Sequence, residues 1–194
     1  MSDVKTFKVE SSESTAKWDF IQVSDQQGFN WDEYQIWKEA AEYIWTRHGI
    51  NSTKFTINTG DMTQNGNRVS EWLDYYEGRK QIDIPEMPVI GNNDLCPANI
   101  YQLGNGGDSS KINPKNLSFF YTFEMDPENP PIFTIEGKEI FVDSLYSFNY
   151  KNVHFLMVNS EITEGTEKNV YGLSQGGLLY ATIKDWCIQD ITNI

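Results

Sequence analysis

Short apolar runs that end in polar residues and glycine recur three times in the first half of the chain. They cover residues 17–25, 54–61 and 87–94, and each has the pattern of a buried strand with polar side chains at its carboxyl end. Residues 30–48 and 69–77, which lie between them, carry apolar side chains at helical spacing. This alternation predicts a parallel sheet with right-handed crossovers, in which the three polar ends meet at one edge.

The helix expected over 30–48 has clear signals at both ends. Asn30 precedes it and Glu33 follows three residues later, which is the pattern of a capping box, and His48-Gly49 closes it. The helical spacing of apolar residues also predicts its buried face, which consists of Tyr34, Trp37, Ala41 and Ile44.

The second half of the chain has a different pattern. Residues 95–116 are rich in Gly, Asn and Ser, which predicts a long loop. Beyond them we expect antiparallel strands with short turns at 136–137 and 151–152, followed by a helix over 174–191. The expected strands are 117–125, 132–135, 140–149 and 153–159.

Composition narrows the possible partners and the setting. The 194 residues carry a formal net charge of −13, so we expect neither nucleic acid nor a membrane as partner. Cys96 and Cys187 are far apart and no secretory signal precedes the first strand, which favours a reduced setting, either the cytoplasm or an intracellular assembly. Residues 1–16 are polar and lack periodicity, so we expect a tail there and a single domain over 17–194.

Three short motifs occupy the predicted strand ends. They are Asp25-x-Gln27, Gly60-Asp61-x4-Gly66 and Gly91-Asn92-Asn93-Asp94. Each motif alone is compatible with an ordinary turn, because Asp, Asn and Gly are the residues that turns use. In this order and at these spacings, however, the three resemble the D-x-H, G-D-x4-G and G-N-H-D/E motifs of the calcineurin-like metallophosphoesterases.

The resemblance extends beyond the motifs. Residues 146–161 resemble the core strand pair that follows G-N-H-D in purple acid phosphatase-like members of the family, and residues 180–191 resemble their next helix. It implies an α/β fold in which two mixed β-sheets pack face to face as a sandwich flanked by helices. It also implies a metal-dependent phosphoester hydrolase, either a phosphatase or a phosphodiesterase, with divalent Mn, Fe, Zn or Mg as cofactor.

The resemblance also implies a role for each motif residue. Asp25 and Gln27 would hold a first metal ion, Asp61 would bridge to a second, and the amide oxygen of Asn92 would hold that second ion. Asn93 and Asp94 would occupy the catalytic positions of the G-N-H-D/E motif.

The sequence departs from the family pattern at several of these positions. Gln27 replaces the usual His, although an amide oxygen can still bind a hard cation. Asn93 replaces a His that stabilises or protonates the leaving oxygen, and losing a general acid removes roughly 10²–10⁴ in rate. His48 fits a surface residue near a helix end and His154 a structural core residue, and no G-H-x-H motif occurs. These departures predict that one cation or none is bound.

Two functional hypotheses therefore stay open. The chain is either a phosphoester hydrolase whose missing ligands come from another chain or a following reading frame, or a non-catalytic structural or binding subunit of a larger assembly. A phosphate-binding nest in the Gly-rich residues 104–110 is a weaker third idea.

The same comparison with the family predicts a partner. The chain stops before the family's last strands, so we expect the C-terminal part of the sandwich to be missing and a second polypeptide or oligomer to cover the open apolar faces. The side chains expected to need this cover are Phe119, Tyr121, Phe123, Phe155, Met157, Leu179, Ile183 and Trp186.

Overall fold

The computed structural model describes residues 17–28, 30–48, 52–66, 68–94, 132–141, 145–159 and 177–193. Their elements follow in the order β1 (Asp19–Val23), α1 (Trp31–His48), β2 (Thr53–Asn58), α2 (Val69–Arg79), β3 (Glu86–Pro88), β4 (Ile132–Ile135), β5 (Lys138–Phe141), β6 (Tyr146–Tyr150), β7 (Val153–Met157) and α5 (Leu178–Thr192). The expected tail 1–16, the loop 95–116 with its Gly-rich part and the strand 117–125 lie outside the described residues.

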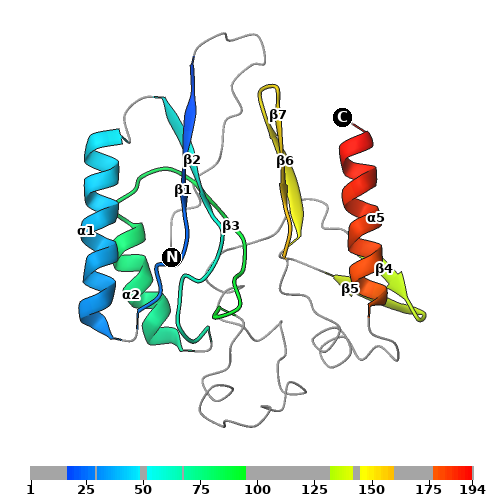
Figure 1. The fold of residues 1–194 in the computed structure, drawn as a ribbon, viewed down its shortest axis with the longest axis horizontal. Helices are drawn as coiled ribbons and strands as arrows, with labels where there is room; N and C mark the ends of the chain where they lie inside the picture. Colours follow the sequence, from blue (N-terminus) through cyan, green and yellow to red (C-terminus); the bar gives the residue numbers. More distant parts are fainter. Residues whose placement is uncertain are drawn as a thin grey trace.

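Three strands form a parallel sheet in the order β1-β2-β3 (Figure 1). The parallel sheet predicted from the alternation of strands and helices is therefore confirmed. β3 is shorter than the strand expected over 87–94, because residues 92–94 form a turn. The Asn93 backbone N–H in this turn donates a hydrogen bond to Asp61 Oδ1 at 2.9 Å, so the chain bends toward the loop after β2 and leaves the sheet.

Helices α1 and α2 cover one face of this sheet (Figure 1). The predicted cap of α1 is confirmed, since Glu33 N donates to Asn30 Oδ1 at 3.2 Å and Asn30 Nδ2 donates to Glu33 Oε1 at 3.1 Å. The predicted apolar face is buried at three of its four positions, and Ile44 is half-buried. The core on this side consists of Tyr34, Trp37, Ala41, Met62, Trp72, Tyr75, Ile82 and Ile90.

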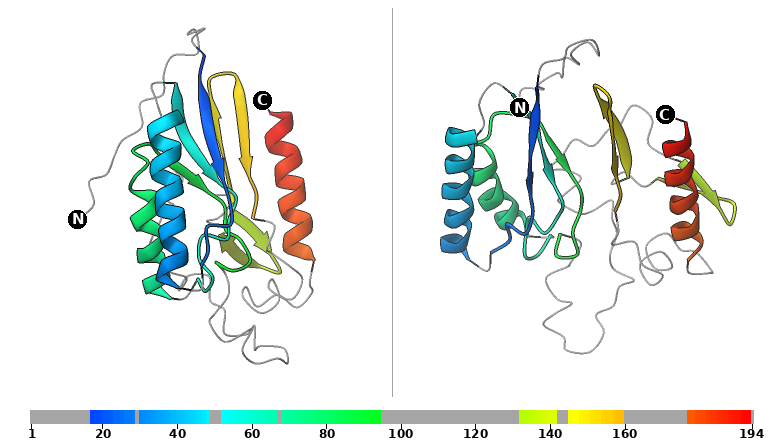
Figure 2. Two further views of the ribbon diagram at one scale, coloured as in Figure 1. Left: turned by 60° about the vertical axis from the view of Figure 1, so that its left-hand side comes forward. Right: turned by 45° about the horizontal axis from the view of Figure 1, so that its top comes forward.

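The hairpin of β6 and β7 covers the other face of the sheet (Figure 2). Phe55 and Ile57 point from β2 toward the hairpin, whereas Thr56 and Asn58 alternate with them and are buried on the helix side. β2 is therefore buried on both faces. The core between sheet and hairpin consists of Phe55, Ile57, Tyr146, Tyr150 and Met157.

Helix α5 packs on the outer side of the hairpin, together with β4 and β5 (Figure 2). Asp190 of α5 lies 2.6 Å from His154 Nε2 of β7 and accepts a hydrogen bond from Ser147 of β6 at 3.2 Å. The layers thus follow the order helices, parallel sheet, hairpin, helix, which confirms the α/β class. The third core cluster consists of Phe133, Ile135, Leu145, Leu179 and Ile183.

The prediction of a single strand over residues 140–149 is wrong. Residues there belong to β5 and β6, which pair with β4 and β7 in two separate antiparallel hairpins. The predicted turns at 136–137 and 151–152 are confirmed, with φ of 53° at Glu136, 73° at Gly137 and 53° at Lys151. Two-residue turns of this kind fix the register of the two strands that they join. β5 therefore pairs with β4, β6 pairs with β7, and the two hairpins share no strand.

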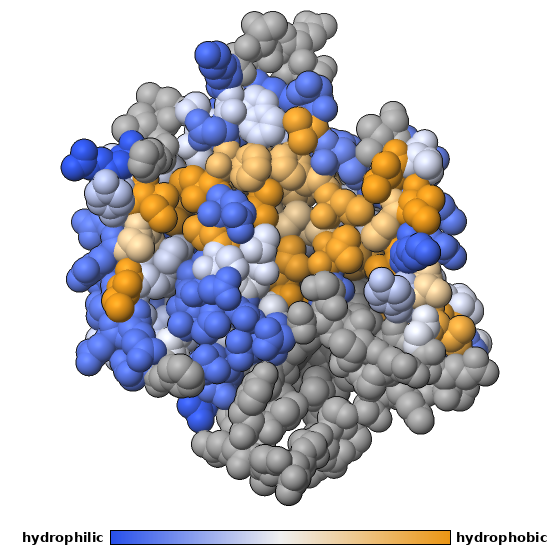
Figure 3. All heavy atoms as spheres, in the orientation of Figure 1, coloured by the Kyte–Doolittle hydropathy of each residue, from blue (hydrophilic) through white to orange (hydrophobic). Residues whose placement is uncertain are grey.

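The chain itself buries several side chains that the sequence analysis assigned to a partner interface. Met157, Leu179 and Ile183 are at most 5% exposed, and Phe155 packs in the core between sheet and hairpin. Apolar side chains still extend across the face seen in Figure 1, from the sheet over the hairpin toward α5 (Figure 3). The second polypeptide stays a prediction.

Among the helices that the structure describes, none combines the length and the apolar character needed to cross a bilayer.

Candidate metal centre

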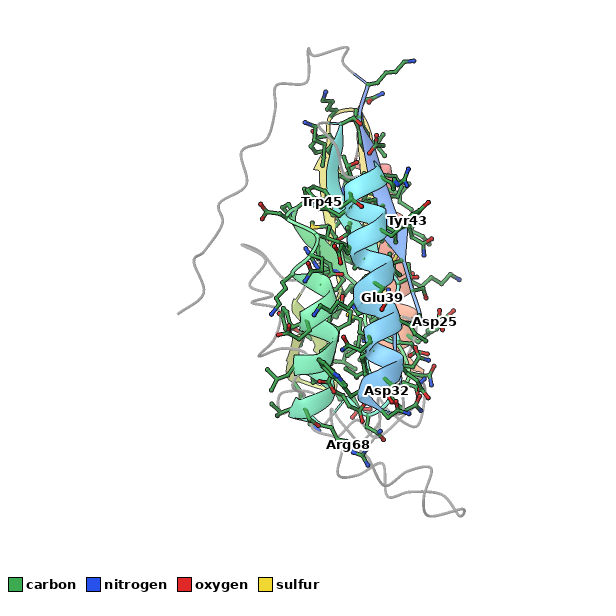
Figure 4. The ribbon with its side chains drawn as sticks, turned by 90° about the vertical axis from the view of Figure 1, so that its left-hand side faces the viewer. Asp25, Asp32, Glu39, Tyr43, Trp45 and Arg68 are labelled. Atoms are coloured by element: carbon green, nitrogen blue, oxygen red, sulfur yellow. The ribbon has the colours of Figure 1, made fainter. Side chains whose placement is uncertain are left out.

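The carboxyl ends of β1 and β2 bring Asp25 and Asp61 to one edge of the sheet. The parallel register sets Val23 opposite Asn58, so the loops that follow the two strands run side by side. Figure 4 shows Asp25 at the end of β1, beside the first half of α1. Backbone hydrogen bonds of 3.0 Å join the loops, from Thr59 N to Val23 O, from Asp25 N to Gly60 O and from Gln27 N to Asp61 O.

Both aspartates have a left-handed backbone, with φ of 59° at Asp25 and 56° at Asp61. This conformation is uncommon outside glycine and costs about 1–3 kcal/mol, so the surrounding structure must hold it in place. Glu136 and Lys151 share it, but they lie in hairpin turns that require positive φ. Asp25 and Asp61 follow parallel strands, where no hairpin geometry accounts for their conformation.

The loop after β3 completes the edge. Asn93 donates to both carboxylate oxygens of Asp61, from its backbone nitrogen to Oδ1 at 2.9 Å and from its side-chain Nδ2 to Oδ2 at 3.0 Å. This approach requires glycine at 91, because a Cβ there would lie 2.3 Å from both the nitrogen and Oδ1 of Asp61. The carboxylate of Asp61 is thus fixed by the third motif.

The side-chain amide of Asn92 also lies beside Asp61. In the orientation favoured by its surroundings its nitrogen donates to Asp61 Oδ2 at 3.3 Å and its oxygen accepts from the backbone N–H of Asn93, also at 3.3 Å. In the other orientation the amide oxygen faces the carboxylate oxygen, which is repulsive unless a cation lies close to both. Asn92 therefore stands where its oxygen and Asp61 could bind one cation together.

Asp25, Asp61 and Asn92 line one cavity of about 540 Å³. The predicted neighbourhood of these three residues is present in the structure. Residues 155–158, from the end of β7 and just beyond it, form the opposite wall, which is apolar. The cavity thus has an acidic, oxygen-rich side and an apolar side.

Gln27 does not line this cavity. With Asp25 it lines a second cavity, of about 620 Å³, between β1 and α1. Its Oε1 atom is buried without a hydrogen-bond partner among the residues that the structure describes. An amide oxygen without a donor retains its capacity to bind a cation, so Gln27 is compatible with the ligand role implied by the family, on the far side of Asp25.

The two expected catalytic residues face away from the cavity lining. The side chain of Asn93 donates to Asp61 and accepts from Gln64 Nε2 at 3.3 Å. Asp94 is fully buried and accepts hydrogen bonds from Gly91 N at 3.0 Å, Thr63 N at 2.9 Å and Thr63 Oγ1 at 3.1 Å. Both side chains hold the loops together in this arrangement.

Burial governs the protonation of Asp94. Removal from water and, as a smaller effect, the nearby Asp61 carboxylate together raise the pKa of its carboxyl group to about 7, although the hydrogen bonds from Gly91 and Thr63 lower it. The backbone of Asp94 also packs closely against residue 66. Glycine is needed there, because a Cβ would lie 1.5 Å from the carbonyl oxygen of Asp94. Gly66 and Gly91 of the motifs thus each have a steric cause.

The donor set fits a hard divalent cation. Asp25, Asp61 and Asn92 offer carboxylate and amide oxygens, the ligands that Mg²⁺ and Mn²⁺ prefer. Within the described ranges no group of three His, Cys, Asp or Glu side chains is placed to bind a metal. His154 is bonded to Asn149 Oδ1 at 2.8 Å and to Asp190, which agrees with the structural role expected for it.

The sequence pattern does not identify two buried residues that hold these loops. Thr63 binds Asp94, and Asn58 contacts both metal-centre loops through its side chain. Asn58 carries a recognisable signal, since it is an amide within the apolar strand segment that precedes Gly60.

Comparison of the chain with protein-family models, curated proteins and solved structures found no match.

Proposed function

We propose that this chain is a metal-dependent phosphoester hydrolase domain of the calcineurin-like type, in which Asp25, Asp61 and Asn92 bind a divalent cation and the adjoining cavity binds the phosphoester. The observation that carries the proposal is the meeting of three motif residues in one cavity at the carboxyl ends of parallel strands. The order of layers, with two β layers between helices, is compatible with the sandwich that the resemblance implies.

The chemistry of the donors favours one Mn²⁺ or Mg²⁺ ion, bound weakly. All three ligands are oxygen donors, and tight binding of two ions would need nitrogen donors. A divalent cation, when bound, polarises the phosphoester and offsets its charge. Asn93 keeps the Asp61 carboxylate oriented, and the apolar wall from residues 155–158 faces the organic part of the ester.

The second candidate is a non-catalytic domain that retains the cation site. It is favoured by Asn93, whose side chain stands at the family's acid position but is bonded to Asp61 and Gln64. An amide cannot transfer a proton to a leaving group as an imidazolium does. Binding without turnover would be the signature of this candidate.

A titration with Mn²⁺, followed by electron paramagnetic resonance of the free ion, tests the shared cation site. We expect one weak site, and Asp61→Asn should weaken it by about tenfold or more because it removes a ligand charge. Asp185→Asn is the matched control, since it removes the same charge from an exposed position on α5. Equal affinities in the two variants would contradict the proposal.

Hydrolysis of bis(p-nitrophenyl) phosphate with Mn²⁺ separates the two candidates. Turnover that Asp61→Asn abolishes and Asp185→Asn preserves would establish the hydrolase. Mn²⁺ binding at Asp61 with no turnover of this ester or of p-nitrophenyl phosphate would establish the non-catalytic domain.

A further inference from the structure

A single buried amide contacts both carboxylate-bearing loops of the metal centre. Asn58, the last residue of β2, is fully buried. Its Oδ1 accepts a hydrogen bond from Gly60 N at 3.1 Å, directly before Asp61. Its Nδ2 donates to Gln26 Oε1 at 3.2 Å, directly after Asp25. One side chain that does not line the cavity of the two aspartates therefore links their loops, in addition to the backbone hydrogen bonds between them.

The direction of the Asn58 amide is set by two acceptors behind it, the Tyr75 hydroxyl and Glu86 Oε1, which lies 3.3 Å from Asn58 Nδ2. Asn58 Nδ2 lies 2.9 Å from the hydroxyl of Tyr75 on α2, and that hydroxyl donates to Glu86 Oε1 at 2.7 Å. Burial, and after it the Glu86 carboxylate, raises the pKa of the Tyr75 hydroxyl well above its ordinary value. The hydroxyl therefore keeps its proton for Glu86 and offers Asn58 only an acceptor.

Glu86 is held in turn by Arg79. The Arg79 Nε atom lies 2.9 Å from Glu86 Oε2, and the two side chains are 12% and 4% exposed. Arg79 also donates to the carbonyl oxygens of Ile82 and Ile84. A carboxylate can only accept hydrogen bonds. Glu86, held by Arg79, therefore fixes the direction of the hydrogen bonds that run from Asn58 Nδ2 to the Tyr75 hydroxyl and from that hydroxyl to Glu86.

From this geometry we propose that Asn58 is a positioning residue for the metal centre, oriented by Tyr75 and Glu86 so that its oxygen faces the Gly60 N–H. The inference rests on the proposed function for its link to cation binding. An amide turned the other way would point its nitrogen at the Gly60 N–H, and the loop that carries Asp61 would lose this contact. The Arg79–Glu86 ion pair thus affects the geometry of the metal centre, although neither side chain is a metal ligand.

Tyr75→Phe is the informative variant, because Asn58→Ala leaves buried groups unpaired and can prevent folding. It removes one of the two acceptors behind the Asn58 amide and leaves only the longer contact of Asn58 Nδ2 with Glu86 Oε1, at 3.3 Å. Thr56→Val is the matched control, since Thr56 is also fully buried on the helix side of β2 and its hydroxyl donates to Pro85 O at 3.4 Å, away from the metal-centre loops. Both variants of the full chain are measured by Mn²⁺ titration, thermal melting and amide hydrogen exchange.

We expect Tyr75→Phe to weaken Mn²⁺ binding by about three- to tenfold, the effect of one hydrogen bond on an equilibrium constant. The Gly60 amide should exchange faster, relative to the Val89 amide, which donates to the Asn58 carbonyl oxygen at 2.7 Å and reports opening of the sheet itself. Thr56→Val should leave both quantities unchanged, even if it lowers the melting temperature.

Two results would overturn the inference: unchanged exchange at Gly60 in Tyr75→Phe, or an equal loss of Mn²⁺ affinity in both variants, which would reflect stability alone. A third outcome is faster exchange at Gly60 in Tyr75→Phe while the wild-type chain binds no Mn²⁺. It would leave the positioning role intact and refute the proposed function. The two failures are therefore distinguishable.

Discussion

Replacement of Phe55 by alanine tests the packing of the parallel sheet against the hairpin. Phe55 is fully buried at the centre of β2. Five aromatic rings surround it, with centroids between 5.3 and 6.1 Å away, and they come from β1, β6, β7 and the residue that precedes β1. No other side chain in the described residues has so many recorded ring contacts, so its loss should report directly on this interface.

The expected loss is large. Truncation of a buried Phe to Ala costs about 3–5 kcal/mol, because apolar burial is lost and a cavity remains. We therefore expect Phe55→Ala to lower the free energy of unfolding by about 4 kcal/mol, which is a large part of a typical domain stability of about 5–15 kcal/mol.

Phe20→Ala is the matched control. Phe20 stacks on Phe55 at 5.6 Å but is 41% exposed, so its truncation should cost only about 1 kcal/mol, roughly half the value of full burial. Urea unfolding followed by circular dichroism gives both values, provided that the slope with urea is the same. Similar losses in the two variants would refute the reasoning, since Phe55 would then not be sealed between sheet and hairpin.

Two further predictions concern Asp94 and α5. Burial raises the pKa of Asp94 to about 7 from an ordinary 3.8, so the stability that its protonated carboxyl group contributes is complete below about pH 4 and is lost as the pH rises through 7. Asp94→Asn should therefore reduce the difference between the free energies of unfolding in urea at pH 5 and at pH 8. An unchanged difference would contradict the assignment. Asp190→Asn removes the carboxylate that contacts His154 and Ser147 and should lower the free energy of unfolding by about 1.5–3 kcal/mol. The control Asp185→Asn, at an exposed position of α5, should leave it nearly unchanged. Equal effects of the two variants would exclude a role for Asp190 in anchoring α5.

The elements that could be predicted from sequence are those with local causes. The capping box at Asn30 and Glu33 sets the start of α1 by contacts three residues apart, and helical spacing identifies Tyr34 and Trp37 as buried. The boundary between β5 and β6 could not be found in this way. Both segments mix apolar and polar residues, and which neighbour each strand pairs with decides where one strand ends.

The candidate site shows the same division. Asp25, Asp61 and Asn92 were predictable as neighbours, because the carboxyl ends of parallel strands meet at one edge of the sheet. The placement of Gln27 in a second cavity and the burial of Asp94 were not, because each depends on contacts between loops that are far apart in sequence. Motif spacing identifies which residues meet but leaves open which way their side chains point.

The polar residues of β2 carry information that apolar periodicity leaves out. A strand buried on both faces normally reads as continuously apolar, yet Thr56 and Asn58 occupy the helix side of β2 and are fully buried. A buried amide lowers stability unless its hydrogen-bonding groups are paired, and Asn58 is paired with Gly60, Gln26, Tyr75 and Glu86. An apolar side chain at 58 would pack there with fewer demands on its surroundings, but it could not hold the loops of Asp25 and Asp61. Where a core position breaks the apolar pattern and the intruding group bonds to both loops of one site, the break itself indicates the site.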